Sequence, residues 1–264
     1  MRNTIRIFFF VLAAVILAGA GPVTAGDGVE FDFDGATPVG SWQEREQVQT
    51  DAKGKQTVTV MKMSFLGEEE RGGEPFIWIE NEITTFKVKK SGRKPTGEPV
   101  VMKALMKKSL FEGDVINSLS NLNNFAAEII VQSGDNPPMR ISGAGSMGGM
   151  MQAMGIAIEY DITPDGTESV TVPAGTFDCR RYKGHGTTTA KIVFKTMTVE
   201  SRSTQWISDD VPFGVVKIVS DDDVNGKTTH TETVLTAFGK SGAKSKITGE
   251  PMDMPSMGNL FGGG

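Results

Sequence analysis

Four methionines between residues 147 and 154 are the side chains whose type and spacing most suggest chemistry. Met147, Met150, Met151 and Met154 would share one face of a short helix. Thioether sulfur is a soft ligand that selects Cu(I), so copper handling by methionine is one interpretation. No histidine or cysteine lies nearby, and flexible methionine faces also form adaptable apolar surfaces. A lid over an apolar ligand, or an ordinary packed or disordered segment, explains the cluster better, and we expect no metal site.

A second motif, between residues 221 and 232, fits the spacing of an EF-hand calcium loop. Such a loop needs a helix on each side, whereas both flanks here are rich in β-branched residues. A two-residue hairpin turn at Asn225-Gly226 explains the same letters more simply. The pairs expected across this hairpin are Val216 with Leu235, Ile218 with Thr233, and Asp221 with His230.

The glycines at 143, 145 and 148, with Asp161 further along, imitate a dinucleotide-binding fingerprint. The run before them contains only Ile141 as a clear core residue, and the helix after them would reach barely two turns before Gly155. We therefore expect no nucleotide site and no cofactor.

Catalytic constellations are also missing from the sequence pattern. His185 and His230 are the only histidines, and neither has a suitably placed nucleophile. Gly184 and Gly186 flank the first of them, which predicts a turn or bulge there. Acidic clusters fall in turn-like stretches, where solvated charge is the usual role. We therefore expect a binding protein rather than an enzyme.

The N-terminal segment predicts export. Arg2 and Arg6 precede an apolar run, and small residues ending at Ala25 follow it, which is the pattern of a signal peptide. The run is short for a membrane span, so we expect no integral span after cleavage. Without residues 1–25 the net charge is about −7, which disfavours nucleic-acid binding. Cys179 is the single cysteine, so no internal disulfide can form, and we expect a buried thiol.

The rest of the chain reads mainly as strands punctuated by turns. We expect three regions: a signal peptide at 1–25, a β-rich half-barrel domain at 26–239, and a flexible Gly/Met-rich tail at 240–264. The fold class is mainly β, with a single strongly curved antiparallel sheet (an incomplete barrel) and one or two short helices. Strands are expected at 41–50, 55–66, 76–89, 125–132, 155–160, 170–172, 177–183, 196–202, 206–208, 214–220 and 228–238; a helix at 115–122; a strand or helix over 101–106; a loop at 91–99; and a turn at 163–166.

Two segments carry a resemblance to a known class of proteins. Residues 170–179 (VTVPAGTFDC) and 206–217 (WISDDVPFGVVK) resemble a pattern of poorly characterised exported bacterial β proteins. Those proteins are similar to the periplasmic lipoprotein-sorting carriers of the LolA/LolB-like class. The likeness covers residues 160–240 well and 40–110 loosely. It implies an incomplete barrel that cups an acyl chain under short helical lids, without catalysis.

Together these observations predict a non-catalytic carrier of an apolar or lipid-like ligand in the periplasm, or secreted. The segments 101–122 and 143–155 would close its half-barrel. An alternative is a structural or assembly component of the cell envelope that docks a protein partner through its Met/Gly segments, and methionine-based copper handling is a third. The candidate ligand-binding residues are Met102, Leu105, Met106, Met147, Met150, Met151 and Met154.

Overall fold

All strands join into one open sheet. The computed structural model describes residues 37–111, 126–142, 157–192 and 195–253. In this part of the chain, thirteen strands form a single sheet with β8 at one edge and β13 at the other, so the sheet is not closed. The predicted mainly β fold with one curved sheet is confirmed. The order across the sheet is β13-β7-β6-β5-β3-β2-β1-β12-β11-β10-β9-β8, with β4 paired to β3.

Neighbouring strands are antiparallel, as predicted, except for the short parallel pair of β13 and β7. A 3₁₀ helix, η1, follows β5, and the helix predicted at 115–122 lies outside the described residues. The elements are β1 (Trp42–Thr50), β2 (Gln56–Arg71), β3 (Glu74–Lys89), β4 (Gly92–Pro95), β5 (Val100–Lys107), η1 (Lys108–Phe111), β6 (Glu128–Ser133), β7 (Met139–Ser142), β8 (Ala157–Val172), β9 (Gly175–Ile192), β10 (Lys195–Ile207), β11 (Val215–Val224), β12 (Thr228–Gly239) and β13 (Met252–Asp253).

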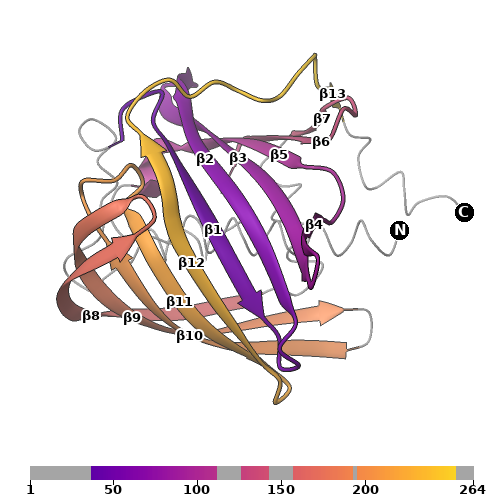
Figure 1. Ribbon diagram of the computed structural model, residues 1–264. Helices are drawn as coiled ribbons and strands as arrows, with labels where there is room; N and C mark the ends of the chain where they lie inside the picture. Colours follow the sequence, from indigo (N-terminus) through magenta and orange to yellow (C-terminus); the bar gives the residue numbers. More distant parts are fainter. Residues whose placement is uncertain (1–36, 112–125, 143–156, 193–194, 254–264) are drawn as a thin grey trace, which may run out of the picture.

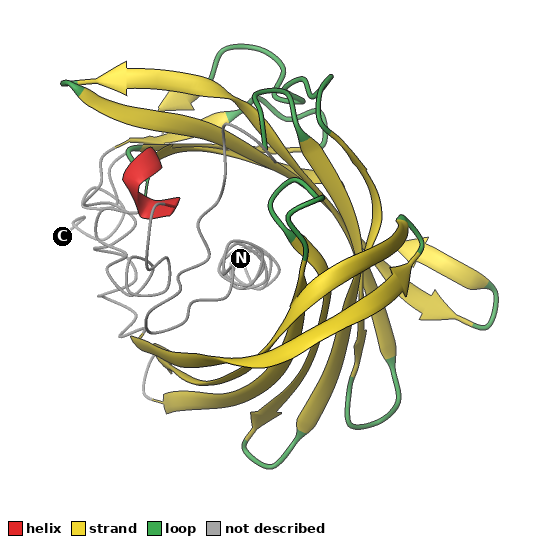
Figure 2. Ribbon diagram, turned by 90° about the vertical axis from the view of Figure 1, so that its left-hand side faces the viewer, coloured by secondary structure: helices red, strands yellow, loops and turns green. Residues whose placement is uncertain are grey.

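The sheet bends into an arch with a concave and an outer face. Figure 1 shows β1, β2, β3, β11 and β12 side by side in its wall. In Figure 2 the strands curve around η1, which lies on the inner side. Phe111 of η1 packs with Ile77 and Met106, so these side chains belong to the concave face. Because side chains alternate along a strand, this contact and the pairing register assign the other strand residues to one face or the other.

Local turn chemistry places the hairpins where the sequence predicts them. Between β1 and β2, the Asp51 carboxylate accepts hydrogen bonds from the backbone N–H groups of Lys53 and Lys55, both at 2.9 Å. Between β11 and β12, Asn225 and Gly226 have φ angles of 56° and 76°. Positive φ at both central residues is characteristic of a type I′ turn. The register of this hairpin pairs Asp221 with His230 and Ile218 with Thr233, as predicted.

Three local predictions need correction. The turn expected at 163–166 is instead an irregularity within β8, where the pairing register shifts between Pro164 and Thr167. The expected loop at 91–99 contains β4, which pairs with β3. Gly184 and Gly186 lie inside β9 rather than at a turn, because the ring of Tyr160 lies against them and a Cβ atom at either position would collide with it. Glycine in a strand here marks a close approach by a large neighbour.

The far ends of β8 and β9 turn back onto the sheet. The backbone N–H of Ala174, in the turn between these strands, donates to the carbonyl of Leu235 on β12 at 3.3 Å. The rings of Phe177 and Phe238 meet edge to face with centroids 5.8 Å apart. Cys179 is 2 % exposed in the same apolar cluster, so the predicted buried thiol is confirmed.

Residues 240–253, which we call the C-terminal strap, cross the outer face of the sheet. The carboxylate of the buried Glu80 accepts hydrogen bonds from the Ser245 hydroxyl at 2.6 Å and the Lys246 N–H at 2.7 Å. Gln132 exchanges two hydrogen bonds of 2.9 Å with Thr248. The prediction of a flexible tail over 240–264 did not anticipate these contacts. Residues 254–264 lie outside the described part.

Candidate functional site

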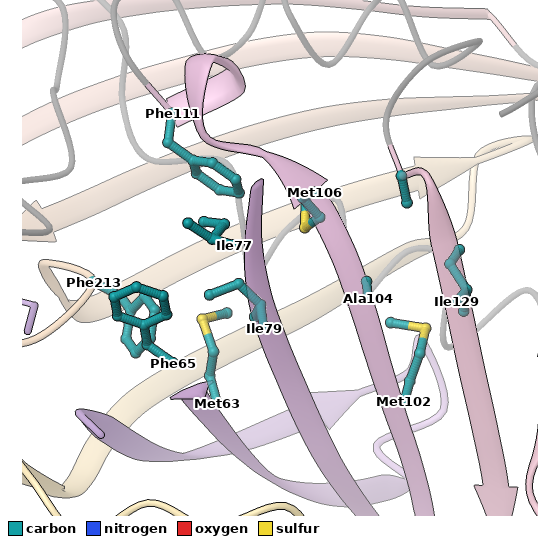
Figure 3. Close-up of a cluster of buried hydrophobic side chains, with 11 residues drawn as sticks. Met63, Phe65, Ile77, Ile79, Met102, Ala104, Met106, Phe111, Ile129 and Phe213 are labelled. Carbon is teal, nitrogen blue, oxygen red and sulfur yellow. The ribbon is translucent and has the colours of Figure 1, made fainter. Parts of the chain in front are cut away.

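One half of the concave face is apolar. The side chains come from β2, β3, β5 and β6, none is more than 6 % exposed, and all of them are labelled in Figure 3. Their burial removes apolar surface from water, worth about 1.5–3 kcal/mol for each large side chain. We call this set the apolar half: Met63, Phe65, Ile77, Ile79, Met102, Ala104, Met106 and Ile129.

Phe213 connects this half to the other side of the arch. It lies between β10 and β11, and Figure 3 shows its ring against that of Phe65. Its φ angle of 60° is unusual for a bulky residue, and its backbone N–H donates to the Thr37 hydroxyl at 3.0 Å. The turn after β10 therefore packs across the apolar half at one end of the arch.

The predicted ligand-binding residues divide into three groups. Met102 and Met106 lie in the apolar half of the concave face. Leu105 is fully buried, but the alternation along β5 places it on the outer face, paired with Trp78. The expectation that 101–122 forms a lid is wrong for residues 101–107, because these belong to the wall strand β5. Met147, Met150, Met151 and Met154 lie outside the described residues.

The other half of the concave face is polar. The register from Met63 and Met61 leads across β1, β12, β11 and β10, and every residue of this set is at most 7 % exposed. Apolar residues such as Leu235 and Ile218 interrupt it. We call this set the polar half: Gln43, Arg45, Ser203, Gln205, Ser220, Thr231 and Thr233.

Arg45 is the most unusual residue of the polar half. It is 2 % exposed, and its Nε and Nη2 atoms have no hydrogen-bond partner in the described structure. Burial lowers the pKa of Arg45 to about 10, so the guanidinium stays protonated at neutral pH. An unpaired buried charge costs several kcal/mol. Groups retained at such a cost are candidates for function.

Gln43 lies next to Arg45 on the same face and shares this property. Both ends of its amide group are buried without a partner. Residues two apart on one strand face are about 7 Å apart, close enough for both side chains to contact one small group. The two residues therefore form a paired set of open donors, with one open acceptor on Gln43.

Strand pairing explains why Arg45 faces inward while the carboxylates beside it do not. Glu46 faces outward and forms two hydrogen bonds to Arg93, at 2.6 and 2.8 Å. Between Glu44 and Arg45 the pairing with β12 shifts by one residue, which leaves Thr236 as the extra residue of a β-bulge. The Thr236 hydroxyl donates to the Glu44 carbonyl at 3.1 Å. Such bulges aim side chains at defined points.

Further along the same face, polar groups bond to one another. Tyr160 and Ser203 share a hydrogen bond of 2.6 Å, and the Ser201 hydroxyl donates to Asp222 at 2.6 Å. Burial raises the pKa of the Asp222 carboxyl and of the Tyr160 hydroxyl. These four side chains therefore have partners within the protein, whereas the open atoms of Arg45 and Gln43 have none.

A pocket of about 420 Å³ lies apart from the two halves, between β8, β9 and the end of β10. Cys179 and Ile207 line it together with polar residues, and Arg180 pairs with Asp209 at 2.6 Å at its exposed rim. Burial raises the pKa of the Cys179 thiol to about 11, which makes it a poor nucleophile at neutral pH. This pocket does not share the open donors of the polar half.

The described ranges lack two other kinds of feature. No cluster of three or more histidine, cysteine or acidic side chains there is arranged to hold a metal ion. No described helix has the length and apolar character needed to span a membrane.

The chain is similar to known proteins in one family comparison and two structural ones. Residues 117–235, less than half of the chain, match a protein-family model described as DUF3108-like. A crystal structure of a candidate lipoprotein from Parabacteroides distasonis is 19% identical, with 77% of this chain and 96% of that chain covered and a TM-score of 0.38. A candidate exported protein with a YmcC-like fold from Bacteroides fragilis is 14% identical, with 77% and 97% covered and a TM-score of 0.38. No curated protein matches the chain.

Proposed function

We propose that the concave face binds an apolar, lipid-like ligand and that the protein carries this ligand without chemically altering it. The observation that carries the proposal is the apolar half, a patch of buried apolar side chains across four adjacent strands, with the buried amide of Asn81 between Met63 and Met102. Three of its members are methionines, whose flexible thioether side chains adapt to irregular apolar shapes. An open arch with such an inner surface suits a flexible chain better than a rigid polar substrate.

The positions of the two histidines support binding rather than catalysis. His185 is exposed on the outer side of β9, and His230 is exposed and pairs with Asp221 at 2.8 Å on the β11–β12 hairpin. Neither imidazole is part of the concave face, so the usual general base is missing from the residues that would contact the ligand. The proposal is therefore a carrier function.

We also propose that the protein works outside the cytoplasm. The signal-peptide pattern of residues 1–25 supports work outside the cytoplasm, in the periplasm or as a secreted protein. Expression of the full chain in a bacterial host should give an extracytoplasmic product that begins at Gly26. N-terminal sequencing that finds Met1 on a cytoplasmic product would contradict export.

The carrier proposal is tested by extracting ligand from the purified protein. We expect mass spectrometry of an organic extract to detect an acyl-chain molecule at a stoichiometric amount, and a fluorescent fatty-acid analogue to bind saturably. The double variant Met102→Gln and Met106→Gln should weaken the fluorescent analogue at least about tenfold, since each amide replaces apolar contact area. Val88→Gln, at an exposed position of β3, is the matched control and should bind normally.

One result would contradict the carrier proposal. If the extract contains no lipid and the fluorescent analogue does not bind, the carrier proposal fails. A stably co-purifying envelope protein in that case would favour the assembly alternative.

A further inference from the structure

We propose that Arg45 and Gln43 form a subsite for an anionic head group, a carboxylate or a phosphate, so that the ligand is an amphipathic acid. This inference rests on the proposed function, because it names the chemical class of the ligand that the concave face carries. It adds a recognition site that the apolar half alone does not imply.

The open atoms of Arg45 have the geometry of an anion site. Nε and Nη2 lie on the same edge of the planar guanidinium, and both lack a partner. Two parallel N–H groups on this edge match two oxygen atoms of a carboxylate or phosphate, which is the bidentate arrangement that such anions favour. The Gln43 amide adds a further donor beside them, and its open oxygen can accept from a hydroxyl of the ligand.

A structural role does not explain Arg45, as a comparison with the ion-paired arginines shows. Arg71, Arg93, Arg140, Arg180 and Arg181 each lie within 3.4 Å of an acidic oxygen, and their side chains are 33–48% exposed. Arg45 has neither an ion pair in the described structure nor solvent contact. A bound anion would supply the missing partner.

The position of Arg45 also fits an amphipathic molecule. Its paired residue on the neighbouring strand β2 is Met61, and Met63 of the apolar half lies two residues further along β2. From β1 to β6 the sheet extends over four interstrand spacings, about 19 Å in all. A head group at Arg45 therefore allows an acyl tail to lie across the apolar half.

The test compares three ligands with the same tail on the mature full-length protein. Palmitic acid, hexadecanol and 1-palmitoylglycerol 3-phosphate are titrated by calorimetry into wild type, Arg45→Met, Arg45→Lys and the control Arg93→Met. We expect wild type and Arg93→Met to bind one of the two acids at least about tenfold more tightly than the alcohol. Which acid binds more tightly identifies the head group.

Arg45→Met should bring the acids and the alcohol to within about threefold while the alcohol affinity is kept. Arg45→Lys keeps the charge but not the bidentate Nε/Nη2 edge, so it should retain only part of the preference for acid over alcohol. This variant also keeps the test decisive if Arg45→Met does not fold. Equal binding of acid and alcohol by wild type, or full preference in both variants, would overturn this inference and leave the carrier function standing. Failure of all three ligands to bind wild type would instead sink the carrier function itself.

Discussion

The apolar and polar halves of the concave face are buried to a similar degree but differ in how their interactions are completed. In the apolar half, side chains such as Phe65 and Ile79 find their partners within the protein. In the polar half, Arg45 and Gln43 have donors and acceptors that nothing in the described structure satisfies. Burial stabilises the fold in the first case and costs free energy in the second. The apolar half therefore supplies most of the stability and the proposed contact with the acyl tail, whereas Arg45 and Gln43 supply the proposed recognition of the head group.

The contrast within the polar half supports the same division. Tyr160, Ser203 and Asp222 take part in side-chain hydrogen bonds of 2.6 Å, so a buried polar surface in this fold can satisfy itself. Glu80 on the outer face is likewise buried and fully engaged by the C-terminal strap. Single oxygen atoms of Ser41, Gln205 and Thr231 are also without a partner, but Arg45 combines two open donors with a buried charge.

The largest effect is expected in the apolar half. Phe65→Ala should lower the free energy of unfolding by about 3–5 kcal/mol, because the substitution leaves a cavity against Phe213 and Ile79. Val88→Ala, at an exposed position of the same sheet, should change it by at most about 0.5 kcal/mol. Urea unfolding followed by circular dichroism measures both. Similar small effects in the two variants would remove the stabilising role of the apolar half.

A change of opposite sign is expected at Arg45. Burial lowers its pKa in the folded state to about 10, well below the usual range of an arginine, which corresponds to a penalty of about 3 kcal/mol on the charged form. Below pH 10 the group is charged in both the folded and the unfolded state, so the whole penalty applies at neutral pH. The penalty is lost only as the pH rises above about 10, toward the higher pKa of the unfolded state. Arg45→Met should therefore raise the free energy of unfolding of the ligand-free protein at pH 7.

The comparison for this variant is Arg93→Met, which breaks an exposed ion pair with Glu46 and should lower the free energy of unfolding by at most about 1 kcal/mol. Denaturant titration of delipidated protein gives both values. Destabilisation by Arg45→Met under these conditions would mean that Arg45 supports the fold, and the division between the halves would be wrong there.

The smallest effects come from two threonines on β12. Thr231→Val removes a buried hydroxyl that has no partner and should raise the free energy of unfolding by about 1 kcal/mol. Thr236→Val removes a hydroxyl that donates to the Glu44 carbonyl and should lower it by about 1 kcal/mol. The two values, measured by the same unfolding experiment, should therefore differ in sign. Equal losses would show that Thr231 is satisfied in solution.

The sequence predicted the features that depend on local chemistry. Asn225-Gly226 specifies its turn type through positive φ, and this fixes the register of the β11–β12 hairpin with no information from elsewhere in the chain. The alternating pattern likewise predicted most strands and the single curved sheet. Met102 and Met106 were predicted as ligand-binding residues, and the structure places both on the concave face.

The features that depend on distant pairing were missed. In the sequence, Arg45 stands between Glu44 and Glu46, which is the usual pattern of a solvated charged strand. Pairing with Met61 of β2 places Arg45 on the concave face, and Leu235 of β12, some 190 residues later, is its partner on the other side. The glycine at 186 was interpreted as a turn for a similar reason. It is needed because the ring of Tyr160, on the neighbouring strand β8, lies against it, and the sequence does not show that contact. Residues 43–47 are all polar, so no alternation in the sequence distinguishes the inward Gln43 and Arg45 from their outward neighbours.

One measurement tests the division between the two halves most directly: the thermal unfolding of delipidated wild type and Arg45→Met, each with and without the acid that wild type binds more tightly, palmitic acid or 1-palmitoylglycerol 3-phosphate. A ligand that binds only the folded state raises the midpoint of unfolding. We expect Arg45→Met to have the higher midpoint without ligand, and this acid to raise the midpoint of wild type but to raise that of the variant much less. An equal increase in both proteins, or a lower midpoint for ligand-free Arg45→Met, would contradict the account.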